Sequence, residues 1–105
     1  MIDIILGNCI NELKSLDSCS VDLIIADPPY NVGKDYGNTS DKLDFNDYIA
    51  FTKEWLVECH RVLKDSGTIY VFVGFRFISY IYQILEKELN MNFINWISWH
   101  YTHGI

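Results

Sequence analysis

The segment Asp27-Pro28-Pro29-Tyr30 places a carboxylate and an aromatic ring on either side of two prolines, which are the only prolines of the chain. Each proline fixes its own φ and biases the residue before it toward an extended backbone. The carboxylate of Asp27 and the ring of Tyr30 are therefore held at a defined separation. This tetrapeptide directly follows an apolar run, so it predicts a strand end that presents chemistry to a ligand.

Other reactive side chains do not form a second pattern. The cysteines Cys9, Cys19 and Cys59 lack Cys-x-x-Cys spacing, and their odd number indicates free thiols in a reducing cytosol. We expect them to be buried as small hydrophobic side chains. His100 and His103 have the spacing of a metal-binding pair, but no cysteine or acidic residue lies near them in the sequence, so we expect no metal site.

Length and charge narrow the class of protein. The chain has 105 residues, is 50% hydrophobic and carries a net charge of −6, which predicts at most one domain with a real core. A general nucleic-acid-coating protein is usually basic. A nucleic-acid enzyme whose basic surface lies elsewhere is still compatible with this charge. Because neither a signal peptide nor a membrane-length apolar run is present, we expect a soluble cytoplasmic protein without membrane partners.

The apolar pattern predicts strands alternating with helices. Strands are expected at residues 2–6, 21–26, 68–73 and 92–99, and helices at residues 8–16, 46–64 and 77–89. The order βαβαβαβ predicts a mainly parallel sheet with right-handed crossovers and helices on its faces. The run at 21–26 is almost continuously apolar, as in a strand covered on both faces.

The predicted sheet brings two segments to one edge. In such sheets ligands bind beyond the carboxyl ends of the strands. The tetrapeptide follows the second strand, and Gly74-Phe75-Arg76 follows the third. Arg76 could meet nucleic acid or only solvent. The long loop at residues 31–45, with Lys34 and Lys42, could be a binding lid or solvent-facing chain.

The tetrapeptide after an apolar strand resembles the catalytic motif of the DNA methyltransferases that methylate adenine N6 or cytosine N4. Residues 21–36, the helix and strand leading to residue 71, and the segment 95–99 all resemble parts of that family's domain. The resemblance implies a Rossmann-like methyltransferase fold. It also implies S-adenosylmethionine as co-substrate, DNA as partner and a role in restriction-modification.

The resemblance also implies roles for the four residues. The carboxylate of Asp27 and the backbone carbonyl of Pro28 would accept hydrogen bonds from the target amine, and fixed acceptors of this kind stabilise developing charge. Pro29 would hold the backbone rigid, and Tyr30 would stack on the flipped base. Asp27 would also lie at the edge shared with the co-substrate. Aspartate rather than serine at this position favours adenine over cytosine.

The sequence departs from the family in one respect. No two glycines have the Gly-x-Gly spacing of the family's S-adenosylmethionine loop, and no target-recognition region follows. Residues 1–105 are therefore expected to be the N-terminal, catalytic-motif part of the domain, inactive alone and completed by a C-terminal half or by self-association. Two alternatives remain: a cytosine-N4 methyltransferase, and a non-catalytic binding or dimerisation remnant.

Overall fold

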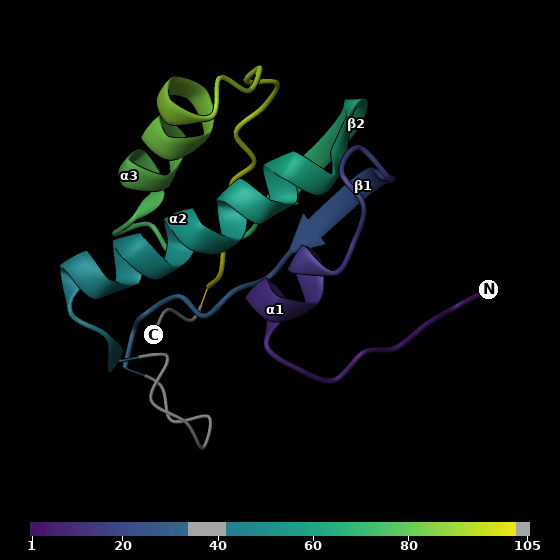
Figure 1. Ribbon diagram of the computed structural model, residues 1–105. Helices are drawn as coiled ribbons and strands as arrows, with labels where there is room; N and C mark the ends of the chain where they lie inside the picture. The colour runs from purple at the N-terminus through teal and green to yellow at the C-terminus, as the bar shows by residue number, and fades with distance from the viewer. Residues whose placement is uncertain (34–41, 103–105) are drawn as a thin grey trace.

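The computed structural model describes residues 1–33 and 42–102. Two parallel strands are joined by a long helix that crosses over one face of the sheet (Figure 1). The elements in chain order are α1 (Cys9–Lys14), β1 (Val21–Ala26), α2 (Phe45–Val62), β2 (Leu63–Val71), α3 (Ile78–Gln83) and the π-helical segment η2 (Ile84–Glu88). The described part of the chain thus has the predicted α/β character.

Helix α2 organises the core. Its N-terminus is capped by Asp44, whose carboxylate accepts a hydrogen bond from the backbone N–H of Asp47 at 2.8 Å. One face is buried at helical spacing, comprising Tyr48, Thr52, Trp55, Leu56, Cys59 and Val62. This face packs with Ile10 of α1 and with Phe77, Ile81 and Ile84 from the α3 region. The helix expected at residues 46–64 is thus confirmed, with ends at Phe45 and Val62.

The strands pair in parallel from Leu23 opposite Thr68 to Ala26 opposite Val71. The preceding pair is Val21 opposite Leu63, so β2 bulges at the residues before Thr68. A Cβ atom on Gly67 would lie 2.6 Å from Leu63 Cδ1 and 3.0 Å from the Asp22 carbonyl oxygen. The bulge therefore depends on glycine at this close approach.

Strand β2 begins directly after α2, earlier than the sequence predicts. Residue 63 is already extended, with φ −73° and ψ 133°, whereas the helix was expected to continue to residue 64 and the strand to begin at 68. Leu63 is 6% exposed and pairs with Val21, so its side chain is buried as the first residue of β2 rather than in a further turn of the helix.

The expected order βαβαβαβ is not reproduced in the described part of the chain. Residues 2–6 and 92–99 lie outside any strand, and their apolar side chains are largely exposed. Figure 1 shows the N-terminal segment extending away from the body of the molecule. The apolar pattern of a segment indicates which side chains it could bury as a strand. A strand also needs a neighbouring strand with which its backbone can form hydrogen bonds. Within the described residues, only β1 and β2 pair with each other.

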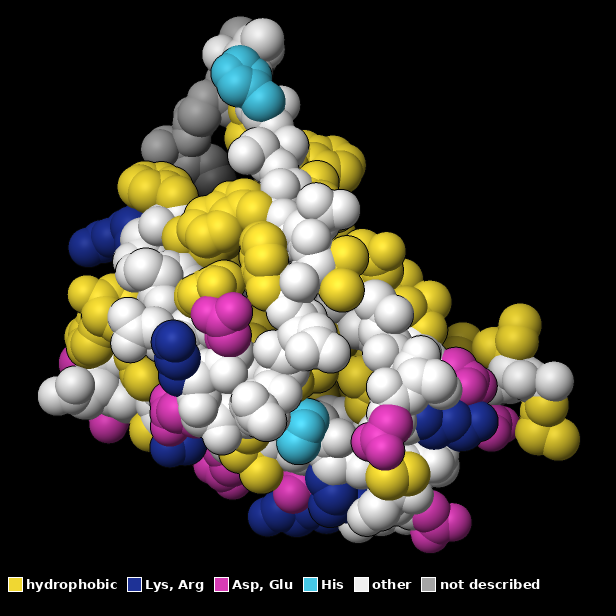
Figure 2. Space-filling model, turned by 90° about the horizontal axis from the view of Figure 1, so that it is seen from above, with side chains coloured by type: hydrophobic (Ala, Val, Ile, Leu, Met, Phe, Trp, Pro, Cys, Tyr) yellow, Lys and Arg dark blue, Asp and Glu magenta, His cyan; other side chains and the backbone are white. Residues whose placement is uncertain are grey.

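The sheet is covered on one face. Ile24, Ala26, Ile69 and Val71 pack against the core, whereas Leu23, Ile25, Tyr70 and Phe72 on the opposite face are 42–65% exposed. The expectation that residues 21–26 are covered on both faces is therefore wrong for the described structure. Figure 2 shows hydrophobic side chains exposed over much of the face seen from above. No helix within residues 1–33 and 42–102 is long and apolar enough to cross a membrane.

The three cysteines differ in environment. Cys9 and Cys19 are exposed, which corrects the expectation that all three are buried. Cys59 lies on the buried face of α2. Burial, with smaller contributions from Cys9 and Glu58, raises the pKa of the Cys59 thiol to about 11. Cys59 therefore remains protonated at neutral pH, and a protonated thiol is a poor nucleophile.

We expect iodoacetamide at pH 8 to modify Cys9 and Cys19 in the native protein and to modify Cys59 only after denaturation. Raising the pH toward 11 should accelerate Cys59 labelling as its thiolate forms. Peptide mass mapping over a time course measures each rate. Native labelling of Cys59 as fast as that of Cys9 would show that the α2 core opens on the labelling timescale.

Candidate active site

The tetrapeptide lies where the two strands end. Asp27 directly follows β1, and Gly74 lies three residues after the end of β2. A Cβ atom on Gly74 would be 3.6 Å from the Cβ of Tyr30, so the segments after the two strands are in close proximity. The structure thus brings together the two segments that the sequence predicts at one edge of the sheet.

The carboxylate and the ring of the tetrapeptide contact each other. The Tyr30 hydroxyl donates a hydrogen bond of 2.5 Å to Asp27 Oδ1. Asp27 is exposed, and Tyr30 is half-buried, as are Pro28 and Pro29. The two prolines therefore place an accessible acceptor within hydrogen-bonding distance of an aromatic ring. The carboxylate acceptor and the aromatic ring are thus held side by side at the edge of the sheet.

Helix α2 holds the backbone of the tetrapeptide. The Tyr48 hydroxyl donates a hydrogen bond of 2.5 Å to the carbonyl oxygen of Pro29. Tyr48 is 1% exposed, and its ring centroid lies 4.6 Å from that of Phe77. The spacing of apolar residues puts Tyr48 on the apolar face of the helix expected at residues 46–64, and it gives no sign of this role. The available signal was a tyrosine at a buried position, because a buried phenol usually has a polar partner.

Asn31 fixes the chain just beyond the tetrapeptide. Its side-chain Nδ2 donates to the Leu43 carbonyl and its Oδ1 accepts from the Leu43 N–H, both at 2.8 Å. Its φ of 58° is in the left-handed region, which asparagine adopts more readily than most residues. The pair ties the two ends of the long loop together. Residues 34–41, which include Lys34 and the middle of the loop considered as a lid, lie outside the described residues.

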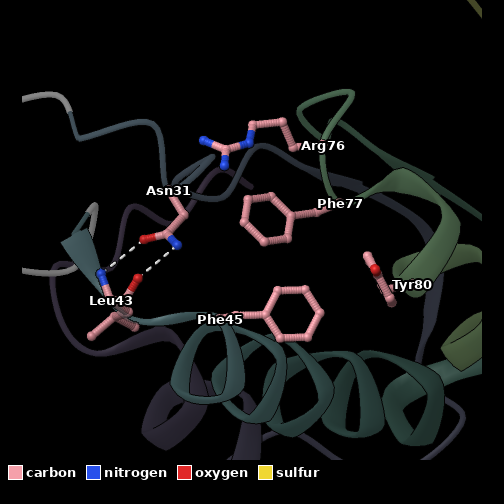
Figure 3. Close-up of a pocket in the computed structure, with 6 residues that line it drawn as sticks. All are labelled: Asn31, Leu43, Phe45, Arg76, Phe77 and Tyr80. Atoms are coloured by element: carbon pink, nitrogen blue, oxygen red, sulfur yellow. Dashed lines mark hydrogen bonds between the residues drawn. The ribbon is translucent and has the colours of Figure 1, made fainter.

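A cavity of about 430 Å³ adjoins this site (Figure 3). Its walls come from the segments after both strands and from the helices, and comprise Asn31, Leu43, Phe45, Arg76, Phe77 and Tyr80. Arg76 is exposed at this edge, as the sequence predicts. Sequence reasoning did not identify Phe45 or Tyr80 as part of the site, because each belongs to a helix whose apolar pattern indicates core packing.

Metal-ligating side chains do not gather at this edge. Within residues 1–33 and 42–102, no group of three histidine, cysteine, aspartate or glutamate residues is placed to hold a metal ion. His103 lies outside the described residues. The groups able to contact a co-substrate or target at the tetrapeptide are thus the Asp27 carboxylate, the backbone carbonyls and the Tyr30 ring.

Comparisons with known proteins identify the family. A model of the DNA methylase family (N6/N4 methyltransferases) matches residues 21–105. Over 102 residues the chain is 60% identical to the type II methyltransferase M.HpaI of Haemophilus parainfluenzae, covering 97% of the chain and 32% of that relative. It is 36% identical over 93 residues to the type II methyltransferase M.BamHI of Bacillus amyloliquefaciens, and this match covers 88% of the chain and 22% of that relative.

The name of a third relative states which base it methylates. The chain is 44% identical over 68 residues to the DNA adenine methyltransferase YhdJ of Escherichia coli K12, covering 65% of the chain and 23% of the relative. The chain thus spans about a third or less of the length of these relatives. The match to the family model includes the tetrapeptide and both strands that position it. The chain therefore belongs to the DNA methylase family of S-adenosylmethionine-dependent N6-adenine and N4-cytosine methyltransferases.

Proposed function

We propose that these residues form the catalytic-motif part of a site-specific DNA adenine-N6 methyltransferase, the modification enzyme of a restriction-modification system. The observation that carries the proposal is the contact between Tyr30 and Asp27 at the carboxyl edge of the sheet. The contact supports the proposal because it brings together a carboxylate acceptor and an aromatic ring, the two groups that a flipped base would need. The similarity to two type II methyltransferases and to a named adenine methyltransferase supports both the reaction and the base.

The chain's residues act on the target amine. S-adenosylmethionine supplies an electrophilic methyl group on a sulfonium sulfur. Asp27 accepts a hydrogen bond from the exocyclic amine, and the Pro28 carbonyl accepts a second. These two acceptors draw the nitrogen toward a tetrahedral geometry and stabilise the positive charge that develops as the methyl–sulfur bond breaks and the methyl–nitrogen bond forms. The sulfur keeps the electron pair of the broken bond, and one amine proton passes to solvent, which restores the neutral base.

Entry of the base requires one local exchange. The Tyr30 hydroxyl contacts Asp27 Oδ1, so the amine must either displace this hydroxyl or use the other carboxylate oxygen. Tyr30 then contributes through its ring, which stacks on the base extruded from the duplex. The short contact therefore keeps the carboxylate oriented before the base arrives.

The experiment that tests the function identifies the methylated nucleoside. We expect the complete protein that carries these residues to produce N6-methyladenine in bacterial DNA, as measured by mass spectrometry of digested nucleosides with isotope-labelled S-adenosylmethionine. N4-methylcytosine in its place would support the cytosine alternative. No methylated nucleoside from any tested DNA would contradict the proposal.

We also propose that residues 1–105 are one part of a longer, Rossmann-like catalytic domain. In that domain residues 2–6 and 92–99 pair as strands, and further chain covers the exposed side chains of Leu23 and Ile25. The support is the coverage of relatives together with the exposed apolar face of the sheet. The glycine loop for S-adenosylmethionine and the target-recognition region would lie in the remainder.

Calorimetry distinguishes this proposal from a self-sufficient enzyme, and rescue of activity distinguishes it from a non-catalytic remnant. We expect weak or no binding of S-adenosylmethionine to residues 1–105 alone, because most of the donor site lies elsewhere. Tight binding to this segment would contradict the division of the domain. Restoration of activity by a separately expressed remainder would argue against a remnant.

A further inference from the structure

The cavity next to the tetrapeptide has the dimensions and position of a second ligand subsite. Its volume of about 430 Å³ falls within the range typical of small-molecule pockets. Asn31, one of its walls, directly follows Tyr30, and the segment that carries Arg76 passes beside Tyr30 at Gly74. The subsite therefore adjoins the proposed target-base site without including Asp27 or Pro28.

Three aromatic rings line the cavity. Phe45 lies near-parallel to Phe77, with centroids 6.0 Å apart and an angle of 28°, and meets Tyr80 edge-on at 4.8 Å. Phe77 is 6% exposed, whereas Phe45 and Tyr80 are 45% and 44% exposed. Phe77 thus forms the floor, and two partly uncovered rings remain at the opening. Aromatic surfaces of this kind stack nucleobases with little dependence on sequence.

Arg76 is the one charged residue among the six that line the cavity. Figure 3 shows its guanidinium extending between Asn31 and Phe77. Among the described residues, no carboxylate forms an ion pair with Arg76. A guanidinium without a carboxylate partner favours an anion, and its planar donors match the geometry of a phosphate. The side-chain amide of Asn31, which lines the same part of the cavity, is fixed by its two hydrogen bonds with the Leu43 backbone.

We propose that this cavity holds a nucleotide of the substrate strand adjacent to the target nucleotide, with its base against Phe45 and Tyr80 and its phosphate at Arg76. The proposal rests on the proposed DNA methyltransferase function and assigns a second strand contact to the same edge. S-adenosylmethionine fits the cavity less well, because it carries a positive sulfonium and a net positive charge. Holding the neighbouring nucleotide would fix the backbone from which the target base is extruded.

Photocrosslinking tests the location. Random-sequence duplexes with 5-iodouracil in place of thymine are irradiated with the complete protein, and crosslinked peptides are mapped by mass spectrometry. We expect crosslinks at Phe45 or Tyr80, unaffected by added S-adenosylhomocysteine. Phe45→Leu should lower the yield, since it keeps the apolar volume and removes the ring. Phe75→Leu is the matched control, because Phe75 is 89% exposed and does not line the cavity.

Salt dependence tests the phosphate contact. Arg76→Gln should reduce the slope of log affinity against log salt concentration by about 0.9, the loss of one phosphate contact. Lys14→Gln removes the same charge from α1, which lies on the opposite side of α2 from α3 in Figure 1, and should leave the slope unchanged. Both side chains are exposed, so neither substitution should impair folding.

Three results would overturn the subsite. These are crosslinks confined to Phe75 or to positions outside the cavity, equal salt slopes for the Arg76→Gln and Lys14→Gln variants, or competition by S-adenosylhomocysteine. The same preparation is assayed for methyl transfer to DNA. Methylation without cavity crosslinks refutes the subsite and leaves the proposed function intact. Cavity crosslinks without methylation support nucleotide binding and refute the enzymatic proposal.

Discussion

Replacing Asp27 with alanine is expected to slow methyl transfer by about a hundredfold to a thousandfold, the typical cost of removing one fixed polar group that stabilises charge in a transition state. Asp27 is exposed at the end of β1, and its contact with Tyr30 is local. The substitution should therefore affect the reaction without unfolding the protein. Transfer of tritiated methyl groups to DNA under single-turnover conditions isolates the chemical step.

Two further variants define what the carboxylate contributes. Asp27→Asn keeps one acceptor oxygen and removes the charge, so we expect a rate between those of the wild type and Asp27→Ala. Asp65→Ala is the control: Asp65 is an exposed aspartate in the β2 bulge, away from the carboxyl edge, and its loss should leave the rate unchanged. A wild-type rate for Asp27→Ala would exclude Asp27 as the amine acceptor.

The elements around this carboxylate were predictable because their signals are local. The buried residues from Tyr48 to Val62 repeat at helical spacing. Asn8, the first residue of the helix expected at 8–16, accepts hydrogen bonds from the N–H groups of Ile10 and Asn11 and so caps α1. The third helix also buries the residues that its spacing predicts, although it continues as the π-helical segment η2. In each case the pattern of residues within a single segment is enough to predict the helix and its buried face.

The contacts that complete the site were not predictable, because they join residues distant in sequence. Asn31 reaches Leu43 twelve positions later, and Tyr48 reaches Pro29 nineteen positions earlier. Neither contact produces a periodic pattern in the sequence from which it could be predicted. The expected strands at residues 2–6 and 92–99 illustrate the same limit, because apolar alternation in a segment does not reveal whether a partner edge is present.

The contact between Tyr48 and Pro29 should have the second large effect on activity. We expect Tyr48→Phe to lower kcat about tenfold, because the half-buried Pro29 carbonyl loses the donor that fixes its direction. The loss of such a bond costs about 1 kcal/mol or more, and 1.36 kcal/mol corresponds to tenfold in rate. The KM for S-adenosylmethionine should not change, because the lost hydrogen bond ends on the Pro29 carbonyl, which belongs to the target side of the site. Tyr82→Phe is the matched control, because the Tyr82 hydroxyl lies on α3, where it contacts Glu86.

The fluorescence of the target base can distinguish a role of Tyr48 in positioning Tyr30 from a role in core stability alone. The pyrrolidine ring fixes φ of Pro29, and the hydrogen bond from Tyr48 fixes the direction of its carbonyl, so together they set where Tyr30 begins. With 2-aminopurine at the target position, fluorescence rises when the base is extruded and falls when it stacks on a ring. The Tyr48→Phe variant should therefore extrude the base as the wild type does, but it should quench the 2-aminopurine fluorescence less than the wild type. A lower unfolding temperature with unchanged quenching and kcat would show that Tyr48 stabilises the core without positioning Tyr30.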